Sequence, residues 1–168
     1  MSDPIRAIRS ADRDELVRMR LCLWPDSEVF EADSVLGRSG SGFVVLVAER
    51  PDGGLCGFAE IGSRPFAEGC QSSPVAYLEG IWVDPDARRC SVALNLVGHA
   101  EKWARSKGFT ELASDCDIDN VGSQAFHAAA GFTEVQRNVC FRRDLASEAA
   151  TDLTWRALVQ TDPRYPEP

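Results

Sequence analysis

The sequence lacks the excess of positive charge that marks a nucleic-acid-binding protein. Its 168 residues carry 18 Lys and Arg against 26 Asp and Glu, which gives a net charge of -8 at pH 7. Because a phosphate binder needs a basic stripe, this balance argues against duplex DNA or RNA as the main partner. A negative surface attracts cations, so a cationic partner stays open, although many acidic proteins are simply soluble.

Long apolar runs are also missing. No stretch approaches the roughly 20 apolar residues that a membrane-spanning helix needs. Residues 1–15 contain no apolar core of a signal peptide. We therefore expect a cytoplasmic protein without a membrane partner.

Cysteine and histidine are too sparse and too scattered for a metal site or a disulfide scaffold. The six cysteines include no Cys-x-x-Cys pair, and the sequence has only two histidines. A structural zinc site takes four such ligands at short spacings, and disulfide scaffolds are much richer in cysteine. We expect no metal, and we interpret the cysteines as free or buried thiols in a reducing compartment.

The hydrophobic pattern predicts one domain of mixed secondary structure. Hydrophobic residues make up 44% of the chain, which is enough for a sizeable core. The expected elements are a strand at 5–8, a helix with Ser10 as N-cap that stops at Pro25, a short helix at 28–38, a hairpin of strands 43–48 and 55–61, a strand at 75–83, a helix at 92–107 closed by Gly108, a strand at 111–115, a helix at 120–130 and a final strand or hairpin arm at 132–145. The order β-α-α-β-β-β-α-β-α-β indicates an α+β or mixed α/β fold.

The C-terminal residues 146–168 differ from the rest. Residues 147–160 favour a short helix, and residues 161–168 are rich in proline. We expect a domain over residues 1–145 followed by an extension, which is either an exposed tail or a packed appendage.

A strand-turn-helix unit at residues 80–93 carries the first chemical signal. Arg88 and Arg89 lie in the turn, and small residues open the helix that follows. Backbone N–H groups at a helix N-terminus have no intrahelical partner, so such a turn can hold a phosphate or pyrophosphate. The two arginines would add charge-assisted hydrogen bonds. Taken alone, this pattern is common, and it is also compatible with a turn that has a purely structural role.

Here the sequence resembles the GCN5-related N-acetyltransferase (GNAT) superfamily. Arg88, Ser91 and Ala93 fall on the defined positions of its acyl-coenzyme A signature, Arg/Gln-x-x-Gly-x-Gly/Ala, and residues 120–132 resemble its second signature. Further blocks are similar to the aminoglycoside 6'-N-acetyltransferases, in that family's order: Leu23-Trp24-Pro25, Gly57-Phe58-Ala59-Glu60, Gly69-Cys70-Gln71-Ser72-Ser73-Pro74, Leu78-Glu79-Gly80-Ile81 and Ala113-Ser114-Asp115. The likeness spans residues 5–144, and the block from Cys70 to Ile81 is its most specific part.

The resemblance implies transfer of an acetyl group from acetyl-CoA to an amine by direct attack in a ternary complex. It implies a mostly antiparallel sheet in which strand 75–83 splays from strand 111–115, with flanking helices and with the pantetheine arm in the gap. The residues that the resemblance assigns to the coenzyme are Ile81, Trp82, Val83, Arg88, Arg89, Cys90, Ser91, Val92, Ala93, Asn120 and Ser123. It also assigns Trp24, Glu60, Ser73, Glu79 and Asp115 to the acceptor, and it implies a homodimer.

The reaction needs a group that takes a proton from the attacking ammonium. Glu79 in the third long strand and Asp115 at a strand end are the candidate carboxylates, acting directly, through water or as anchors for ammonium groups. The alternatives are an outward-facing strand residue for Glu79 and a local turn residue for Asp115. Trp24 either forms the floor of the acceptor pocket or belongs to the core.

His127 stands where many relatives carry a tyrosine that protonates the departing thiolate. Its imidazole has a suitable unperturbed pKa near 6.5. A thiol pKa of about 8.5 also lets the thiolate leave without an acid. The interpretation of His127 as a structural or coenzyme-contacting residue therefore stays open beside the catalytic one.

One departure from the family pattern bears on the coenzyme. Ser91 replaces the glycine expected where the backbone approaches the pyrophosphate, so its Cβ could crowd the phosphate or its hydroxyl could donate to it. Three hypotheses follow: an aminoglycoside 6'-N-acetyltransferase that confers antibiotic resistance, an acetyltransferase for another amine such as a polyamine or peptide, and an acyl-CoA-binding protein with weak turnover.

Overall fold

A computed structural model describes residues 4–27, 29–38 and 42–144. The chain divides into two compact units, residues 1–136 and 137–168. The elements all belong to the first unit and are, in order, β1 (Ile5–Ala7), the 3-10 turn η1 (Ser10–Asp12), α1 (Arg13–Leu23), α2 (Val29–Arg38), β2 (Val44–Glu49), β3 (Leu55–Arg64), β4 (Val75–Val83), the 3-10 turn η2 (Pro85–Ala87), α3 (Val92–Ser106), β5 (Leu112–Ser114) and α4 (Val121–Ala129). This order confirms the expected mixed α/β class.

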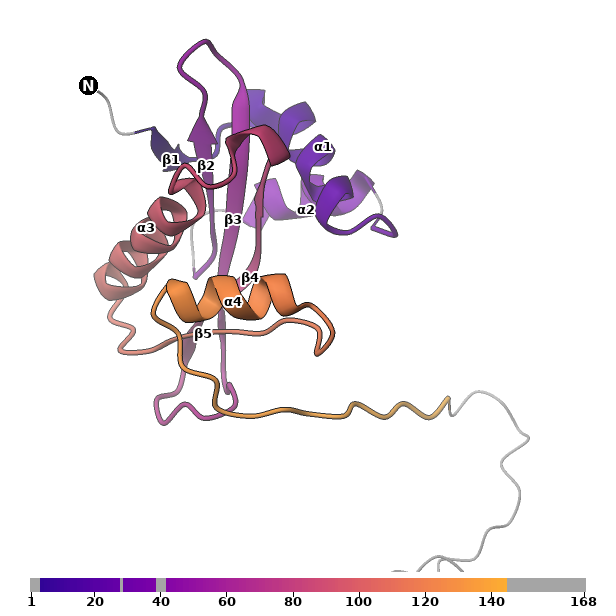
Figure 1. Ribbon diagram of the computed structural model, residues 1–168, viewed down its shortest axis with the longest axis vertical. Helices are drawn as coiled ribbons and strands as arrows, with labels where there is room; N and C mark the ends of the chain where they lie inside the picture. Colours follow the sequence, from indigo (N-terminus) through magenta and orange to yellow (C-terminus); the bar gives the residue numbers. More distant parts are fainter. Residues whose placement is uncertain (1–3, 28, 39–41, 145–168) are drawn as a thin grey trace, which may run out of the picture. The chain divides into compact units, whose positions relative to one another are not determined.

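The strands form one five-stranded sheet in the order β1-β2-β3-β4-β5. The pairs from β1 to β4 are antiparallel, and only β4 and β5 run parallel. Helix α3 covers one face, and α1 and α2 cover the other (Figure 1). The sheet is therefore mostly antiparallel with one parallel pair, as the resemblance implied.

Strand β2 is buried on both faces, and its side chains alternate between two cores. Val44, Leu46 and Ala48 join the cluster that includes Leu96 and Ala100 of α3. Val45 and Val47 join the cluster of Leu16, Met19 and Phe58 under α1. This two-residue period explains why the strand reads as one continuous apolar run.

Two expectations are wrong. Residues 132–144 form no strand, although the sequence favoured a final strand or hairpin arm there, because a strand requires a ladder with a neighbouring strand and local sequence does not specify that neighbour. Ser10 is not the N-cap of α1, because a 3-10 turn precedes that helix and the Arg9 N–H donates to Asp12 over 2.7 Å instead. The expected C-terminal helix at 147–160 lies outside the described residues.

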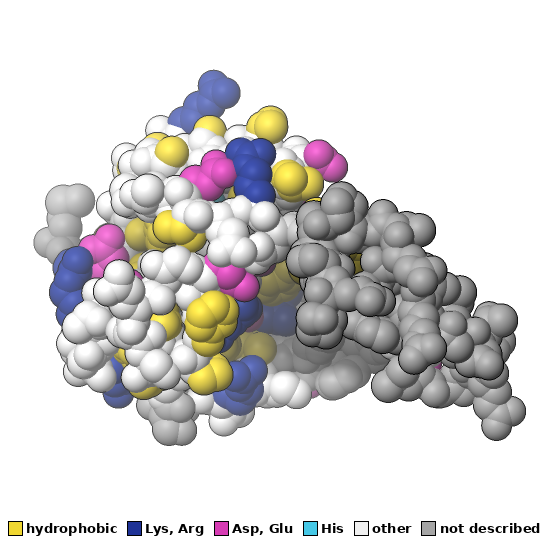
Figure 2. All heavy atoms as spheres, turned by 90° about the horizontal axis from the view of Figure 1, so that it is seen from below, with side chains coloured by type: hydrophobic (Ala, Val, Ile, Leu, Met, Phe, Trp, Pro, Cys, Tyr) yellow, Lys and Arg dark blue, Asp and Glu magenta, His cyan; other side chains and the backbone are white. Residues whose placement is uncertain are grey.

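Among the described residues, no helix has the length and apolar character needed to cross a membrane. On the face seen in Figure 2, basic and acidic side chains lie interspersed among the described residues. The net charge of -8 is thus not concentrated in one acidic patch on that face.

Candidate active site

One extra residue in β4 places Glu79. The pairing with β3 runs through Ile61 and Leu78 and then continues at Glu60 and Gly80, so Glu79 has no partner across the ladder. This β-bulge reverses the alternation of the strand. Leu78 joins the core on the α3 side together with Ile81 and Val83, whereas Trp82 packs with the opposite core.

A cavity of about 410 Å³ lies on the sheet face that α1 and α2 cover. Its lining combines two carboxylates, two arginines and two aromatic rings with smaller groups. The lining residues are Arg20, Trp24, Ser34, Val35, Arg38, Phe43, Glu60 and Glu79. Three of the residues that the sequence assigned to the acceptor, Trp24, Glu60 and Glu79, thus share one cavity.

Two glycines leave room for side chains that line this cavity, Gly80 for Trp24 and Gly62 for Glu79. A Cβ on Gly80 would lie 2.4 Å from two ring carbons of Trp24, so the indole rests directly on the β4 backbone. A Cβ on Gly62 would lie 3.1 Å from the Glu79 Oε1 atom. The side chains of Trp24 and Glu79 therefore depend on bare backbone in β4 and β3.

Glu60 is held in a buried ion pair. The Arg20 Nη1 group donates to the Glu60 Oε1 atom, and only 9% and 5% of the two side chains are exposed. Burial raises the pKa of Glu60, while the Arg20 guanidinium opposes that shift. The Arg20 guanidinium also lies 4.7 Å from the centre of the Trp24 ring. Glu60 is thus part of a fixed wall.

Glu79 is paired with a more exposed arginine. Arg64, the last residue of β3, donates from Nε and Nη2 to the two Glu79 oxygens over 3.2 and 2.5 Å. The guanidinium carbon of Arg64 lies 3.4 Å from the centre of the Tyr77 ring. The Tyr77 hydroxyl in turn donates to Asp115 over 2.7 Å. Glu79 and Asp115, the two candidate carboxylates, are therefore linked through Arg64 and Tyr77.

Ser73 is not brought to the cavity. Its hydroxyl donates to the Pro65 carbonyl over 2.8 Å, within the loop between β3 and β4. Glu111 organises the same loop by accepting from the backbone N–H groups of Gln71 and Ser72. The specific sequence block from Cys70 to Pro74 therefore has a local structural explanation, and an acceptor contact for Ser73 stays a prediction.

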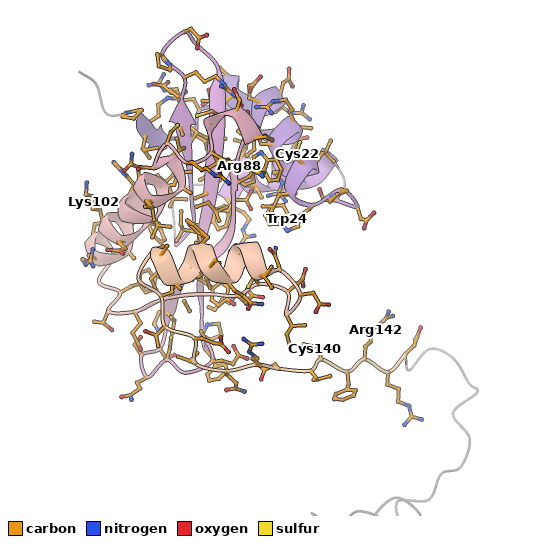
Figure 3. All side chains as sticks on the ribbon, viewed as in Figure 1. Cys22, Trp24, Arg88, Lys102, Cys140 and Arg142 are labelled. Carbon is orange, nitrogen blue, oxygen red and sulfur yellow. The ribbon has the colours of Figure 1, made fainter. Side chains whose placement is uncertain are left out.

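Strands β4 and β5 part directly after Leu78. Their parallel pairing ends at Leu78 and Ser114, while β4 continues to Val83. Ile81, Trp82 and Val83 therefore have no β5 partner, which is the splayed arrangement that the resemblance implied. In Figure 3, Arg88 reaches from the turn before α3 toward β4, where its Nε group donates to the Val83 carbonyl over 2.9 Å. Its guanidinium also lies 4.9 Å from the centre of the Trp82 ring.

The turn before α3 has the left-handed backbone that its signature requires. Arg89 and Ser91 have φ angles of +62° and +61°. Ser91 is the N-cap of α3 but makes no side-chain cap hydrogen bond. The first N–H groups of this 15-residue helix, at Val92 and Ala93, thus have no capping side chain, and no acidic residue stands in the first turn. Together with the exposed Arg89 and Cys90, this arrangement suits an anion.

His127 has a protein partner at each ring nitrogen. Nδ1 lies 2.8 Å from the Ser123 carbonyl oxygen, and Nε2 lies 2.9 Å from the Ser114 hydroxyl. A carbonyl only accepts, so the tautomer with its proton on Nδ1 fits this contact, and the Ser123 hydroxyl also lies 3.3 Å from Nδ1. His127 thus ties α4 to the end of β5, which favours the structural interpretation. Asn120 caps α4 by accepting from the Ser123 N–H over 3.0 Å.

Sequence reasoning missed the arginines of the site. Arg20 follows Leu16 and Met19 on the buried side of α1, and a lone arginine on an apolar helix face signals a buried partner. Arg64 lay beyond the expected end of its strand, because β3 continues to Arg64 rather than stopping at Ile61. In the described part of the chain, no group of three or more His, Cys, Asp and Glu side chains is placed to hold a metal ion.

The chain belongs to the acetyltransferase (GNAT) family, whose model matches residues 6–132. It is 46% identical over 146 residues to the aminoglycoside N(6')-acetyltransferase type 1 of Klebsiella aerogenes, covering 84% of this chain and 96% of that protein. It is 39% identical over 135 residues to the protein of the same name from Serratia marcescens, covering 79% and 92%.

Comparison with solved structures agrees with this family assignment. The fold matches the aminoglycoside 6'-N-acetyltransferase AAC(6')-Ih from Acinetobacter baumannii with a TM-score of 0.78 and 34% identity, over 84% of this chain and 97% of that one. It also matches AAC(6')-Iy in complex with the bisubstrate analog CoA-S-monomethyl-acetylneamine, with a TM-score of 0.77, 32% identity and coverage of 83% and 97%. The fold and the coenzyme class that the resemblance implied are thereby confirmed.

Proposed function

We propose that this protein transfers the acetyl group of acetyl-CoA to the 6'-amine of aminoglycoside antibiotics and so confers resistance to them. The observation that carries the proposal is the position of Glu79, which lines the acceptor cavity one residue after β4 parts from β5. The chain is similar to named aminoglycoside N(6')-acetyltransferases over most of its length.

The coenzyme would lie along the edge of β4 that β5 leaves free. The backbone of Ile81 and Val83 would bond the pantetheine arm, and the N-terminus of α3 would hold the pyrophosphate with Arg89 and Ser91 beside it. Arg88, whose Nε group donates to the Val83 carbonyl, would turn toward the phosphates. Asn120 and Ser123 would approach the coenzyme from α4.

The acceptor would lie in the cavity with a sugar face against Trp24. The 6'-amine must lose a proton before it attacks, and Glu79 would take that proton directly or through one water molecule. The nitrogen lone pair would then form a bond to the thioester carbonyl carbon, the bond from that carbon to sulfur would break, and the nitrogen would lose its second proton to water to give the amide. Coenzyme A leaves as a thiolate, which needs no proton from His127 at a thiol pKa of about 8.5.

Asp115 and Glu60 would have different tasks in acceptor binding. Asp115 is exposed at the end of β5 and accepts a hydrogen bond from Tyr77, so it would anchor a further ammonium group. Glu60 is already neutralised by Arg20, so it would shape the cavity wall rather than bind a cation.

We also propose a homodimer, which light scattering after size-exclusion chromatography tests.

The test is a thiol-release assay with acetyl-CoA and kanamycin, followed by mass spectrometry and NMR of the product. We expect one acetyl group on the 6'-nitrogen and an increased minimal inhibitory concentration for bacteria that express the protein. Thiol release with a polyamine or peptide but not with kanamycin would assign another acceptor. Acetyl-CoA binding without thiol release from any amine would refute both enzymatic functions.

A further inference from the structure

The two carboxylates of the acceptor cavity are each neutralised by an arginine, but the two ion pairs differ in exposure. In the pair of Arg20 and Glu60 the exposed side-chain fractions are 9% and 5%. In the pair of Arg64 and Glu79 they are 43% and 28%. Separating a buried pair leaves an uncompensated charge without water, whereas an exposed pair can open at little cost. Only the pair of Arg64 and Glu79 can therefore exchange its cation readily.

The surroundings of the Arg64 guanidinium are those of a cation-binding site. Glu79 accepts two of its N–H groups, and the Tyr77 ring presents its negative face 3.4 Å away. The Asp115 carboxylate is close enough to contribute to the raised pKa of Arg64, after the larger effect of Glu79. An ammonium group would find the same carboxylates and the same aromatic face.

Arg64 and the cavity meet at Glu79. Glu79 lines the cavity, and Arg64 donates to both oxygens of its carboxylate. An acceptor ammonium in the cavity therefore reaches a carboxylate whose charge Arg64 already compensates. The ammonium of the acceptor and the guanidinium of Arg64 must compete for the same two oxygens.

We propose that Arg64 is the resident counter-ion of the acceptor site and holds the ammonium position at Glu79 until a cationic acceptor displaces it. The inference rests on the proposed function, because it requires a cationic acceptor in this cavity. Arg64 thus sets acceptor affinity, holds the Glu79 carboxylate in its orientation before binding, and moves out when the acceptor ammonium arrives. It is a determinant of binding rather than a catalytic residue.

Substitution of Arg64 tests the competition. We expect R64Q to bind kanamycin about two- to fivefold more tightly than the wild type at low ionic strength, with KM reduced and kcat little changed. The difference should shrink near 1 M salt, where the Debye length is about 3 Å. R64K keeps the charge and should remain close to the wild type. R105Q removes an equal charge from a surface pair with Glu101 on α3 and should leave acceptor affinity unchanged.

The wild-type protein gives a second measurement that does not depend on a variant. The Nε–H signal of Arg64 in ¹⁵N NMR, assigned by its loss in R64K, should shift and exchange faster with water when kanamycin saturates the site. An unchanged signal at saturation would overturn the inference. So would a weaker kanamycin affinity in R64Q, or a lower kcat at unchanged affinity, which would make Arg64 a positioning residue for Glu79. Wild-type protein that binds kanamycin without releasing thiol would instead refute the proposed function alone.

Discussion

The indole of Trp24 rests on the backbone of Gly80, so close that a Cβ at Gly80 would lie 2.4 Å from its ring carbons. Gly80 follows the bulged residue Glu79, so one short segment of β4 provides both a carboxylate and the platform for an aromatic wall. The acceptor cavity therefore depends on the absence of a side chain as much as on those present.

We expect the substitution G80A to damage the acceptor site. The added methyl group must push Trp24 away, which should cost about 1–3 kcal/mol of stability. Displacement of a wall by about 1 Å should lower kcat/KM for kanamycin roughly ten- to a hundredfold. Steady-state kinetics and urea unfolding measure the two effects. The control is G98A in α3, where a Cβ meets nothing within 4 Å, and it should stabilise the protein by about 0.5–1 kcal/mol. Equal activity in G80A and wild type would contradict the prediction.

The substitution S91G should stabilise the turn before α3. Ser91 has a φ of +61°, a conformation that costs a residue with a Cβ about 1 kcal/mol relative to glycine. The melting temperature should therefore rise, and acetyl-CoA affinity measured by calorimetry should stay equal or increase. S106G, at the end of the same helix, should destabilise instead. A clear loss of acetyl-CoA affinity in S91G would show that the hydroxyl binds the coenzyme.

The substitution E79Q should reduce catalysis while sparing the coenzyme. Removal of a proton acceptor lowers turnover by about 10²–10⁴-fold. The dissociation constant of acetyl-CoA should be that of the wild type, since Glu79 lies on the acceptor side of β4. E101Q on α3 is the control with an equal loss of charge. Wild-type kinetics in E79Q would remove Glu79 from the site.

The substitution D115N should act mainly on acceptor binding. Loss of one charge-assisted hydrogen bond to an ammonium raises KM by about tenfold or more. The Tyr77 hydroxyl keeps a carbonyl acceptor in D115N, so the fold around it should remain. Initial-rate kinetics over a range of kanamycin concentrations test this, and a fall in kcat at constant KM would assign Asp115 a catalytic role instead.

The substitution R20M should destabilise the protein in a pH-dependent way. It leaves Glu60 buried without its partner, which should cost about 3–5 kcal/mol near neutral pH. Burial already raises the folded-state pKa of Glu60 above its unfolded value, and loss of Arg20 should raise it further. The folded state then binds the proton more tightly than the unfolded state, so stability falls as the pH rises through that window.

Urea unfolding of R20M at pH 5 and pH 7.5 measures this dependence. The defect should be smaller at the lower pH. The double variant R20M/E60Q should recover much of the lost stability, because glutamine carries no charge. A defect of equal size at both pH values would contradict the assignment to Glu60.

The sequence patterns were most informative where a single element determines its own structure. The apolar stripe of residues 92–107 predicted α3 within one residue, because a helix is set by contacts inside one segment and one buried face. The expectation of a strand at residues 132–145 failed over the described residues 132–144 for the opposite reason. Strand formation depends on a neighbour that no local pattern reports.

The candidate site shows the same limit of prediction from sequence. Trp24, Glu60 and Glu79 could be named from a family resemblance, and they line one cavity. The bulge at Glu79 could not be predicted, since it is a mismatch in register between β3 and β4. Arg64 was missed because its role comes from side chains on two other residues, Glu79 and Tyr77, which lie across the ladder.

The bulge in β4 also decides how this strand tolerates change. Before Glu79 the α3-side core takes an even-numbered residue, Leu78, and after it the odd-numbered Ile81 and Val83. Deletion of Glu79 would restore a regular strand that keeps Ile81 and Val83 on the side of Leu78, but it would remove the carboxylate that the extra residue contributes to the cavity. A complete mutational scan should therefore find that the α3-side core requires an apolar residue at position 78 before Glu79, and at positions 81 and 83 after it. The extra residue Glu79 thus constrains the length of β4 as well as its composition.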